Sequence, residues 1–304
     1  GYGLASNDGV AGPYHGWVFG SDGECRNIPS EPDKPALRER AAITAYPVQE
    51  LGGFIFAYLG PGPVPLLPRY DLYVWDNCLR DIGRAELPCN WLQIMENSVD
   101  PVHVEYLHGH HLAAQHSDGP GQSNWYGKQH TKLGFDVFEH GIIQRRVLEG
   151  GSESDEDWRV GHPLVFPVTL RVGAQGQHRF QVRVPLDDTT TMHYWYSCYL
   201  PPEGETAPAQ DSVPLYEVPW RHDDGSHRTD FVDGGDIMAW VTQGAIADRA
   251  YLTRAVDLAK ANDFVLALDE CYAEIYDEAP PVGGLEVAAA TPDTMAEALA
   301  RHTA

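Results

Sequence analysis

Two histidines five residues apart are the side chains of this 304-residue protein with the clearest chemical potential. They are His103 and His108, and Asp100 stands three residues before the first of them. Neutral imidazole nitrogens bind Fe(II), and a carboxylate beside such a ring fixes its tautomer and raises its basicity. The spacing therefore indicates a mononuclear metal site. Histidines in so His-rich a patch are also typical of an exposed surface, and that alternative stays open here.

The helical character of this segment sets a condition on such a site. Residues 90–108 are mostly helix-compatible, and Asp100 shares a helix face with His103. On an ideal α-helix, however, His103 and His108 point roughly 140° apart. Both can reach one metal only if the helix ends or bends between them, and Pro101 suits the first turn of a new helix. We therefore predict a broken helix.

The residues around the two histidines resemble the iron site of a known enzyme family. The likeness is to α subunits of Rieske non-heme iron ring-hydroxylating oxygenases of the phthalate and chlorobenzoate dioxygenase type, and it rests on Asn90-Trp91, Glu96-Asn97, Asp100, His103 and His108. It implies that His103 and His108 are the two imidazole ligands of a facial triad. It further implies that Asp100 is the acidic bridge of the electron path, and it places Asn90 among the catalytic residues.

The resemblance implies that the third iron ligand comes from the C-terminal part of the chain. Residues 235–249 are similar to the family's carboxylate-bearing helix, and Asp236 aligns with the ligand. Gly235 replaces the Gln or Glu that usually precedes this Asp, so one supporting contact is expected to be missing. Taken alone, Asp236 is also typical of a helix N-cap. Asp233 and Asp230 are the competing ligands.

A further segment resembles half of the motif that holds a [2Fe–2S] cluster. Residues 12–17, Gly-Pro-Tyr-His-Gly-Trp, are similar to C-x-x-H-G-W, in which Cys and His ligate the cluster. His15 is thus the expected cluster ligand, whereas Gly12 stands where the motif has Cys. No C-x-H occurs, so the resemblance implies an N-terminally truncated chain. Truncation does not explain Gly12, and the sequence leaves its cause open.

The periodicity of the remaining chain predicts an α+β fold. Residues 14–60 contain short apolar segments, and residues 130–200 alternate apolar and polar side chains as half-buried strands do. Residues 201–228 are loop-like, and from Asp236 onward the spacing becomes helical. The family implies a remnant of a small all-β Rieske domain over residues 1–62, which ends at a Gly/Pro cluster. It also implies a helix-grip catalytic domain over residues 63–304, with an antiparallel sheet and C-terminal helices.

Charge and cysteine content exclude several classes of protein. Lys and Arg number 21 against 44 Asp and Glu, a formal charge of −23, so nucleic acid and anionic lipid are poor partners. No apolar run is long enough to span a membrane, and no signal peptide is visible. The five cysteines form no CxxC pair, which argues against a disulfide framework and a Cys-rich zinc site and favours the cytoplasm.

The function implied by the resemblance is oxygenation of a small aromatic compound. Such an enzyme uses O2 at a mononuclear Fe(II) to hydroxylate or O-demethylate its substrate, with electrons relayed from NAD(P)H through a reductase or ferredoxin and the [2Fe–2S] cluster. It works as a homo-oligomer, such as a trimer. We expect a mostly apolar pocket. Two other classes remain: a cluster-less helix-grip ligand-binding protein or inactive oxygenase fragment, and an iron enzyme with an organic co-substrate, whose usual HxD…H spacing this chain lacks.

Overall fold

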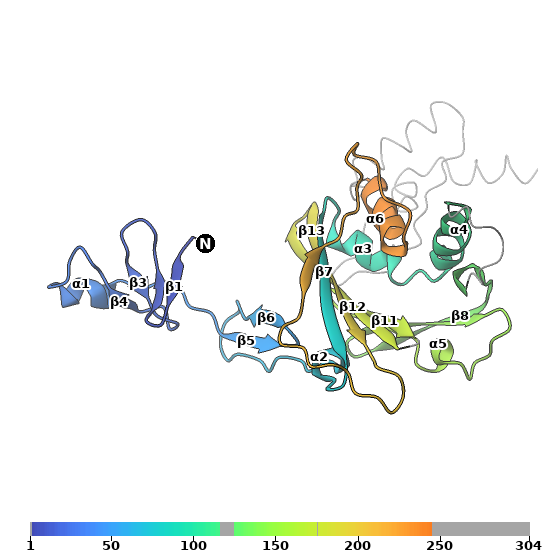
Figure 1. Cartoon of the computed structure of the whole chain (residues 1–304), viewed down its shortest axis with the longest axis horizontal. Helices are drawn as coiled ribbons and strands as arrows, with labels where there is room; N and C mark the ends of the chain where they lie inside the picture. The colour runs from blue at the N-terminus through green and yellow to red at the C-terminus, as the bar shows by residue number, and fades with distance from the viewer. Residues whose placement is uncertain (1, 116–124, 175, 245–304) are drawn as a thin grey trace, which may run out of the picture. The chain divides into compact units, whose positions relative to one another are not determined.

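The computed structural model describes residues 2–115, 125–174 and 176–244, and the chain divides into two compact units, residues 1–76 and 77–304 (Figure 1). The Gly/Pro cluster at residues 60–63 lies inside the first unit. Compactness alone does not assign a function to either unit. The functional boundary at residue 62 therefore stays a prediction.

The first unit consists mainly of short antiparallel strands. A four-stranded sheet contains β1 (Leu4–Ser6), β2 (Gly9–Ala11), β3 (Val18–Phe19) and β4 (Cys25–Asn27) in sequence order. A glycine with positive φ, Gly23, allows the tight turn between β3 and β4. Then follow α1 (Pro35–Arg40), the hairpin of β5 (Val48–Leu51) with β6 (Phe54–Ala57), and α2 (Asp71–Val74).

The second unit is built on one eight-stranded sheet with the strand order β14-β7-β13-β12-β11-β10-β9-β8. Its strands are β7 (Leu79–Leu87), β8 (His130–Phe138), β9 (Gly141–Leu148), β10 (His162–Val165), β11 (Thr169–Ala174), β12 (Gln177–Asp187), β13 (Thr190–Tyr199) and β14 (Leu215–Glu217). All neighbours pair antiparallel except β14, which runs parallel to β7. The loop prediction for residues 201–228 is wrong for β14. The three side chains of this strand are all exposed, so the sequence shows no alternation of apolar and polar residues that would indicate a strand there.

Two helices, α3 (Trp91–Asn97) and α6 (Val232–Thr242), lie together beside the sheet (Figure 1). Their contact with the sheet forms a core whose buried members include Leu87, Ile94, Trp195, Ile237 and Trp240. Each such side chain contributes about 1.5–3 kcal/mol through burial. An antiparallel sheet with helices packed over it confirms the α+β prediction. The helices predicted from residue 245 onward lie outside the described residues.

Direct hydrogen bonds fix α6 against α3. The indole Nε1 of Trp240 donates to Asn97 Oδ1 at 2.9 Å, and Gln93 Nε2 donates to the carbonyl of Gly244 at 2.9 Å. The shorter helices of this unit are η1 (Val104–His111), α4 (Leu112–Gln115), η2 (Trp125–Gly127) and α5 (Glu156–Arg159). Within the part of the chain that the structure describes, no helix is both long and apolar enough to cross a membrane.

The cysteines of the described residues lie in the interior of the protein. Cys25, Cys78, Cys89 and Cys198 are all buried and take part in no disulfide, whereas Cys271 lies outside the described residues. Burial raises the pKa of Cys89 to about 11, so this thiol stays protonated at neutral pH.

Candidate metal centre and its cavity

The predicted break in the first helix exists, but it precedes both histidines. Helix α3 ends at Asn97, and the chain enters η1, a π-helix, directly after His103. A π-helix is closed by i→i+5 hydrogen bonds, so residues five apart stack on one face. The wide turn of η1, and not a bend between His103 and His108, therefore brings the two imidazoles together. Their ring centroids lie 5.1 Å apart.

Asp100 begins this second helical segment. Its Oδ1 accepts the backbone N–H of Val102 at 2.8 Å, and its Oδ2 accepts that of His103 at 3.2 Å. Oδ2 also lies 3.4 Å from His103 Nδ1. Burial acts to raise the pKa of Asp100, yet the hydrogen bonds from His103 and Val102 hold it below its ordinary value. An ionised carboxylate on the Nδ1 side orients the ring so that Nε2 is available to a metal.

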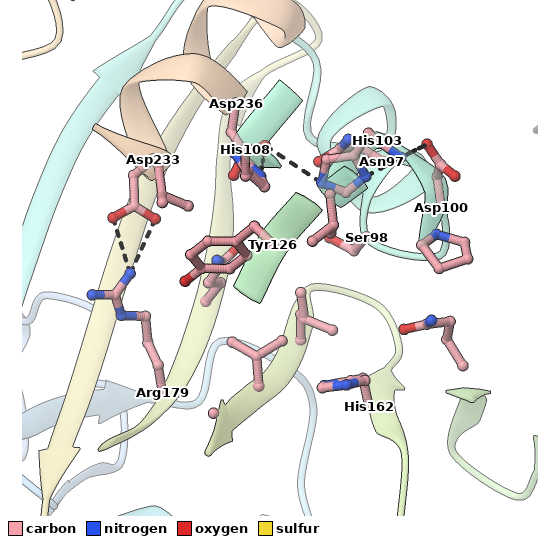
Figure 2. Close-up of a pocket in the computed structure, with 18 of the residues that line it drawn as sticks. Asn97, Ser98, Asp100, His103, His108, Tyr126, His162, Arg179, Asp233 and Asp236 are labelled. Carbon is pink, nitrogen blue, oxygen red and sulfur yellow. Dashed lines mark hydrogen bonds and ion pairs between the residues drawn. The ribbon is translucent and has the colours of Figure 1, made fainter. Parts of the chain in front are cut away.

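Asp236 meets the two histidines from α6. The helix begins at Val232 after the N-cap residue Phe231, so Asp236 lies within the helix and its interpretation as an N-cap is wrong. Its Oδ1 lies 3.1 Å from His108 Nε2 and 3.6 Å from His103 Nε2 (Figure 2). The carboxylate is 8% exposed, and Oδ1 accepts no hydrogen bond from the described residues.

These three side chains fit a divalent metal ion. One ligand atom from each of His103, His108 and Asp236 lies within 4.8 Å of the others. A buried carboxylate oxygen without a hydrogen bond is costly unless a cation compensates it. Two imidazole nitrogens and one carboxylate oxygen are the donor set typical of a non-heme Fe(II) triad.

The competing carboxylates are engaged elsewhere. Both oxygens of Asp233 accept hydrogen bonds from Arg179 Nη1 at 3.0 Å, and burial raises the pKa of Asp233 despite this pairing. Asp230 is half-exposed and pairs with Arg228 at 3.2 Å. Asp236 is thus the carboxylate of this helix that faces the two histidines.

The three candidate ligands line a cavity of about 610 Å³. Strands β9 to β12 contribute other lining residues, including Gln144, Arg146, His162, Leu170, Val172, Arg179 and Gln181. His162 of β10 lies opposite Gln144 of the neighbouring strand β9. Its Nε2 lies 2.9 Å from Asp157 Oδ1. The expectation of a mostly apolar pocket is met only narrowly: apolar surface slightly exceeds polar surface in the cavity wall, but most of the lining residues are polar or charged. Strand alternation shows which residues share a face, but not which face encloses a cavity.

Several cavity residues escaped the sequence analysis, among them Tyr126, Arg146, His162 and Arg179. Tyr126 lies edge-on to His108, with ring centroids 5.9 Å apart. The sequence does hold a sign of the arginines, because Arg179 and Arg183 lie on one face of an alternating strand that also carries buried residues. Their partners lie far away in the sequence, so the pattern did not show what they bind.

Asn90 has the contacts of a helix cap. Its Oδ1 accepts the backbone N–H of Leu92 at 2.8 Å at the start of α3, and its Nδ2 donates to the carbonyl of Asp188 at 2.8 Å. It is not among the residues that line the described cavity. A catalytic role for Asn90 therefore stays a prediction.

The residues at the half-motif of the first unit do not fit a [2Fe–2S] cluster. His15 is exposed and lies next to Tyr14, with ring centroids 4.2 Å apart and the ring planes tilted by 60°. Gly12 has no side chain to offer a ligand, and its backbone N–H donates to the Trp17 carbonyl at 2.8 Å. A Cβ added at Gly12 would meet only that carbonyl oxygen, at 3.7 Å, so a cysteine would fit there sterically. The residues present supply too few ligands for the cluster.

Comparisons with known proteins point to one family. The 5,5′-dehydrodivanillate O-demethylase oxygenase subunit of a Sphingobium species is 35% identical over 251 residues, which are 81% of this chain and 57% of that protein. The phthalate 4,5-dioxygenase oxygenase subunit of Pseudomonas putida is 28% identical over 287 residues, or 82% of this chain and 64% of that protein. No protein-family model matches the sequence.

The chain thus spans less than two thirds of the length of these relatives. Among solved structures, dicamba monooxygenase bound to dicamba is similar with a TM-score of 0.52 at 15% identity, over 95% of this chain and 80% of that chain. At this identity the likeness concerns the fold. Relatives of this kind, with the fold and the residue pattern described above, identify the chain as a member of the Rieske non-heme iron oxygenase family, among its oxygenase subunits.

Proposed function

We propose that this chain is the catalytic part of an oxygenase that binds one Fe(II) between His103, His108 and Asp236 and hydroxylates or O-demethylates a small aromatic compound. The observation that carries the proposal is the convergence of three metal-binding atoms at the wall of a cavity. Fe(II) bound by these three residues would supply the redox chemistry that activates O2 next to the substrate.

The protein's own residues prepare this site. Asp100 holds His103 from its Nδ1 side, and because it is also 28% exposed, we propose it as the contact through which electrons approach the site. A reductase or ferredoxin is the proposed electron donor, and a homo-oligomer is the proposed assembly. A [2Fe–2S] cluster is the proposed last carrier of the relay, and of its ligands the residues in hand supply only the candidate His15.

The polar part of the cavity supports a substrate that carries oxygen groups. Gln144 and Arg146 lie two residues apart on β9 and therefore share a face, and His162 stands opposite Gln144. Leu170 and Val172 of β11 also line the cavity and provide an apolar surface against which an aromatic ring of the substrate can pack. Two relatives are named for dehydrodivanillate and phthalate, and we include aromatic carboxylates among the candidate substrates.

Metal content and oxygen uptake test the proposal. The whole chain, reconstituted without oxygen with Fe(II) and sulfide, should retain about one iron and show no visible spectrum of an iron–sulfur cluster. Oxygen uptake with an external reductant should then depend on an added methoxybenzoate. Tight binding of aromatic compounds without any iron uptake would favour the alternative, a ligand-binding protein, and would contradict the proposal.

A further inference from the structure

A second carboxylate lies beside the proposed iron ligands and needs an explanation. Asp233 and Asp236 are three residues apart on α6, which places them on the same face of the helix, and both line the cavity. The charge of Asp233 interacts with His108 and with Asp236. Without a partner of its own, Asp233 would offer a metal a fourth protein ligand.

Arg179 of β12 occupies that carboxylate. Its Nη1 donates to both oxygens of Asp233 at 3.0 Å, and its Nε donates to Ser197 Oγ of β13 at 3.2 Å. The two charged side chains are only 22% and 20% exposed, so water screens their attraction incompletely. Figure 2 shows this pair beside the group formed by Asp236, His108 and His103. Asp233 is thus bound at both oxygens, whereas Asp236 Oδ1 accepts no hydrogen bond from the described residues.

We propose that Arg179 is a positioning residue that keeps Asp233 out of the coordination sphere of the metal, so that the site holds a single carboxylate. The inference rests on the proposed Fe(II) site. A triad of two histidines and one carboxylate works with open coordination positions. A second carboxylate would fill one of them and would add a negative charge to the cavity.

A purely structural role of the same pair predicts a different result. The pair also ties the first turn of α6 to the sheet, and loss of that tie could misplace Asp236. In that case, removal of both charges is at least as harmful as removal of Arg179 alone. If the freed charge of Asp233 causes the damage, neutralising Asp233 as well should repair it.

The test uses the whole chain loaded with Co(II), whose visible absorption weakens as its coordination number rises, and titrates azide, which needs an open position. Arg179→Met should weaken the absorption and lower azide affinity by about tenfold or more, comparable to the losses of metal affinity or activity that follow removal of a residue supporting a metal ligand. The double variant Arg179→Met/Asp233→Asn should recover both properties. Arg179→Lys, which keeps the positive charge, should resemble the wild type.

The control removes another Arg–Asp ion pair of the sheet, one with a more exposed carboxylate, from the face opposite the cavity. Arg145 pairs with Asp136 at 2.5 Å and, as the neighbour of Gln144 on β9, points away from the cavity. Arg145→Met should leave the Co(II) spectrum and azide affinity unchanged. If Arg179→Met does not fold, Arg179→Gln replaces it. Glutamine keeps hydrogen-bond donors at this position. It carries no positive charge, so the same loss of absorption and azide affinity is expected.

Two results would overturn the role of Arg179 alone: a neutral variant with wild-type spectrum and azide affinity, or a double variant as impaired as the single one. A wild-type chain that takes up no Co(II) and no Fe(II) would overturn the metal site itself, and this inference with it.

Discussion

Two neighbouring glycines on α6 should respond in opposite ways to the same added methyl group. Gly234 and Gly235 are both buried and both helical, and they directly precede Asp236. A Cβ at Gly235 would lie 3.5 Å from Leu107 Cγ and 3.6 Å from Leu107 Cδ1, which are ordinary contacts with the π-helix. A Cβ at Gly234 would lie 2.1 Å from the carbonyl oxygen of Arg228 and 2.5 Å from the ring of Phe231.

These distances set the expected free energies of unfolding. Gly235→Ala should stabilise the protein by about 1 kcal/mol through helix propensity and by up to about 0.8 kcal/mol through the buried methyl group. In Gly234→Ala the added methyl group collides with the carbonyl oxygen of Arg228 and with the ring of Phe231. Overpacking of this kind lowers the free energy of unfolding by about 1–3 kcal/mol. Because α6 carries Asp236, the shift needed to relieve the clash at Gly234 should also weaken metal binding.

Urea unfolding of the metal-free chain, together with Co(II) affinity, measures both effects. We expect Gly235→Ala to unfold at higher urea with unchanged Co(II) affinity, and its thermal midpoint to rise by roughly 2–7 °C. Gly234→Ala should lose both stability and affinity. Equal shifts of the same sign in the two variants would refute this account of how α6 packs against η1 and the loop before it.

Three further predictions concern individual titratable groups. Asp236→Ala should abolish iron retention measured after gel filtration, whereas Asp230→Ala should keep it, because Asp230 is half-exposed and paired with Arg228; equal loss in both would show that the ligand is misassigned. Burial raises the pKa of Glu96 to about 7, so its protonated form favours the folded state and that contribution is lost as the pH rises through this value. In urea unfolding, the free energy of unfolding of Glu96→Gln should therefore rise relative to that of the wild type by about 1 kcal/mol between about pH 5 and pH 8, after allowance for the partial exposure of Glu96. The control Glu86→Gln, at an exposed position, should show no such change. Cys89, whose pKa burial raises to about 11, should resist iodoacetamide in the folded chain at neutral pH, and rapid alkylation there would contradict its buried position.

Much of the candidate site could be predicted from the order of residues along the chain. The types and spacing of His103 and His108, with Asp100 before them, indicated a metal site, and the resemblance added Asp236 as the carboxylate. The period-two pattern of residues 130–200 predicted the antiparallel strands that form most of the large sheet. These signals are local: they depend on the order of neighbouring residues, and that order is fully present in the chain.

The way in which these residues meet depends on the folded chain. An α-helical period made the two histidines diverge, whereas the π-helix η1 aligns them, and nothing in the spacing shows which backbone hydrogen bonds will form. Sequence also left Asp230, Asp233 and Asp236 as alternatives. Their difference comes from partners such as Arg179, which is 54 residues from Asp233 in the chain but within 3.0 Å of it in the fold.

The character of the cavity was likewise decided by the fold. Strand alternation placed Gln144 and Arg146 on one face of β9, but only the packing of α3, η1 and α6 over the sheet shows that this face lines the space next to His103 and Asp236. The physical reason is that the polarity of a cavity depends on which distant surfaces enclose it. Local sequence fixes the order of side chains along each element, while the chain's long-range packing fixes what those side chains face.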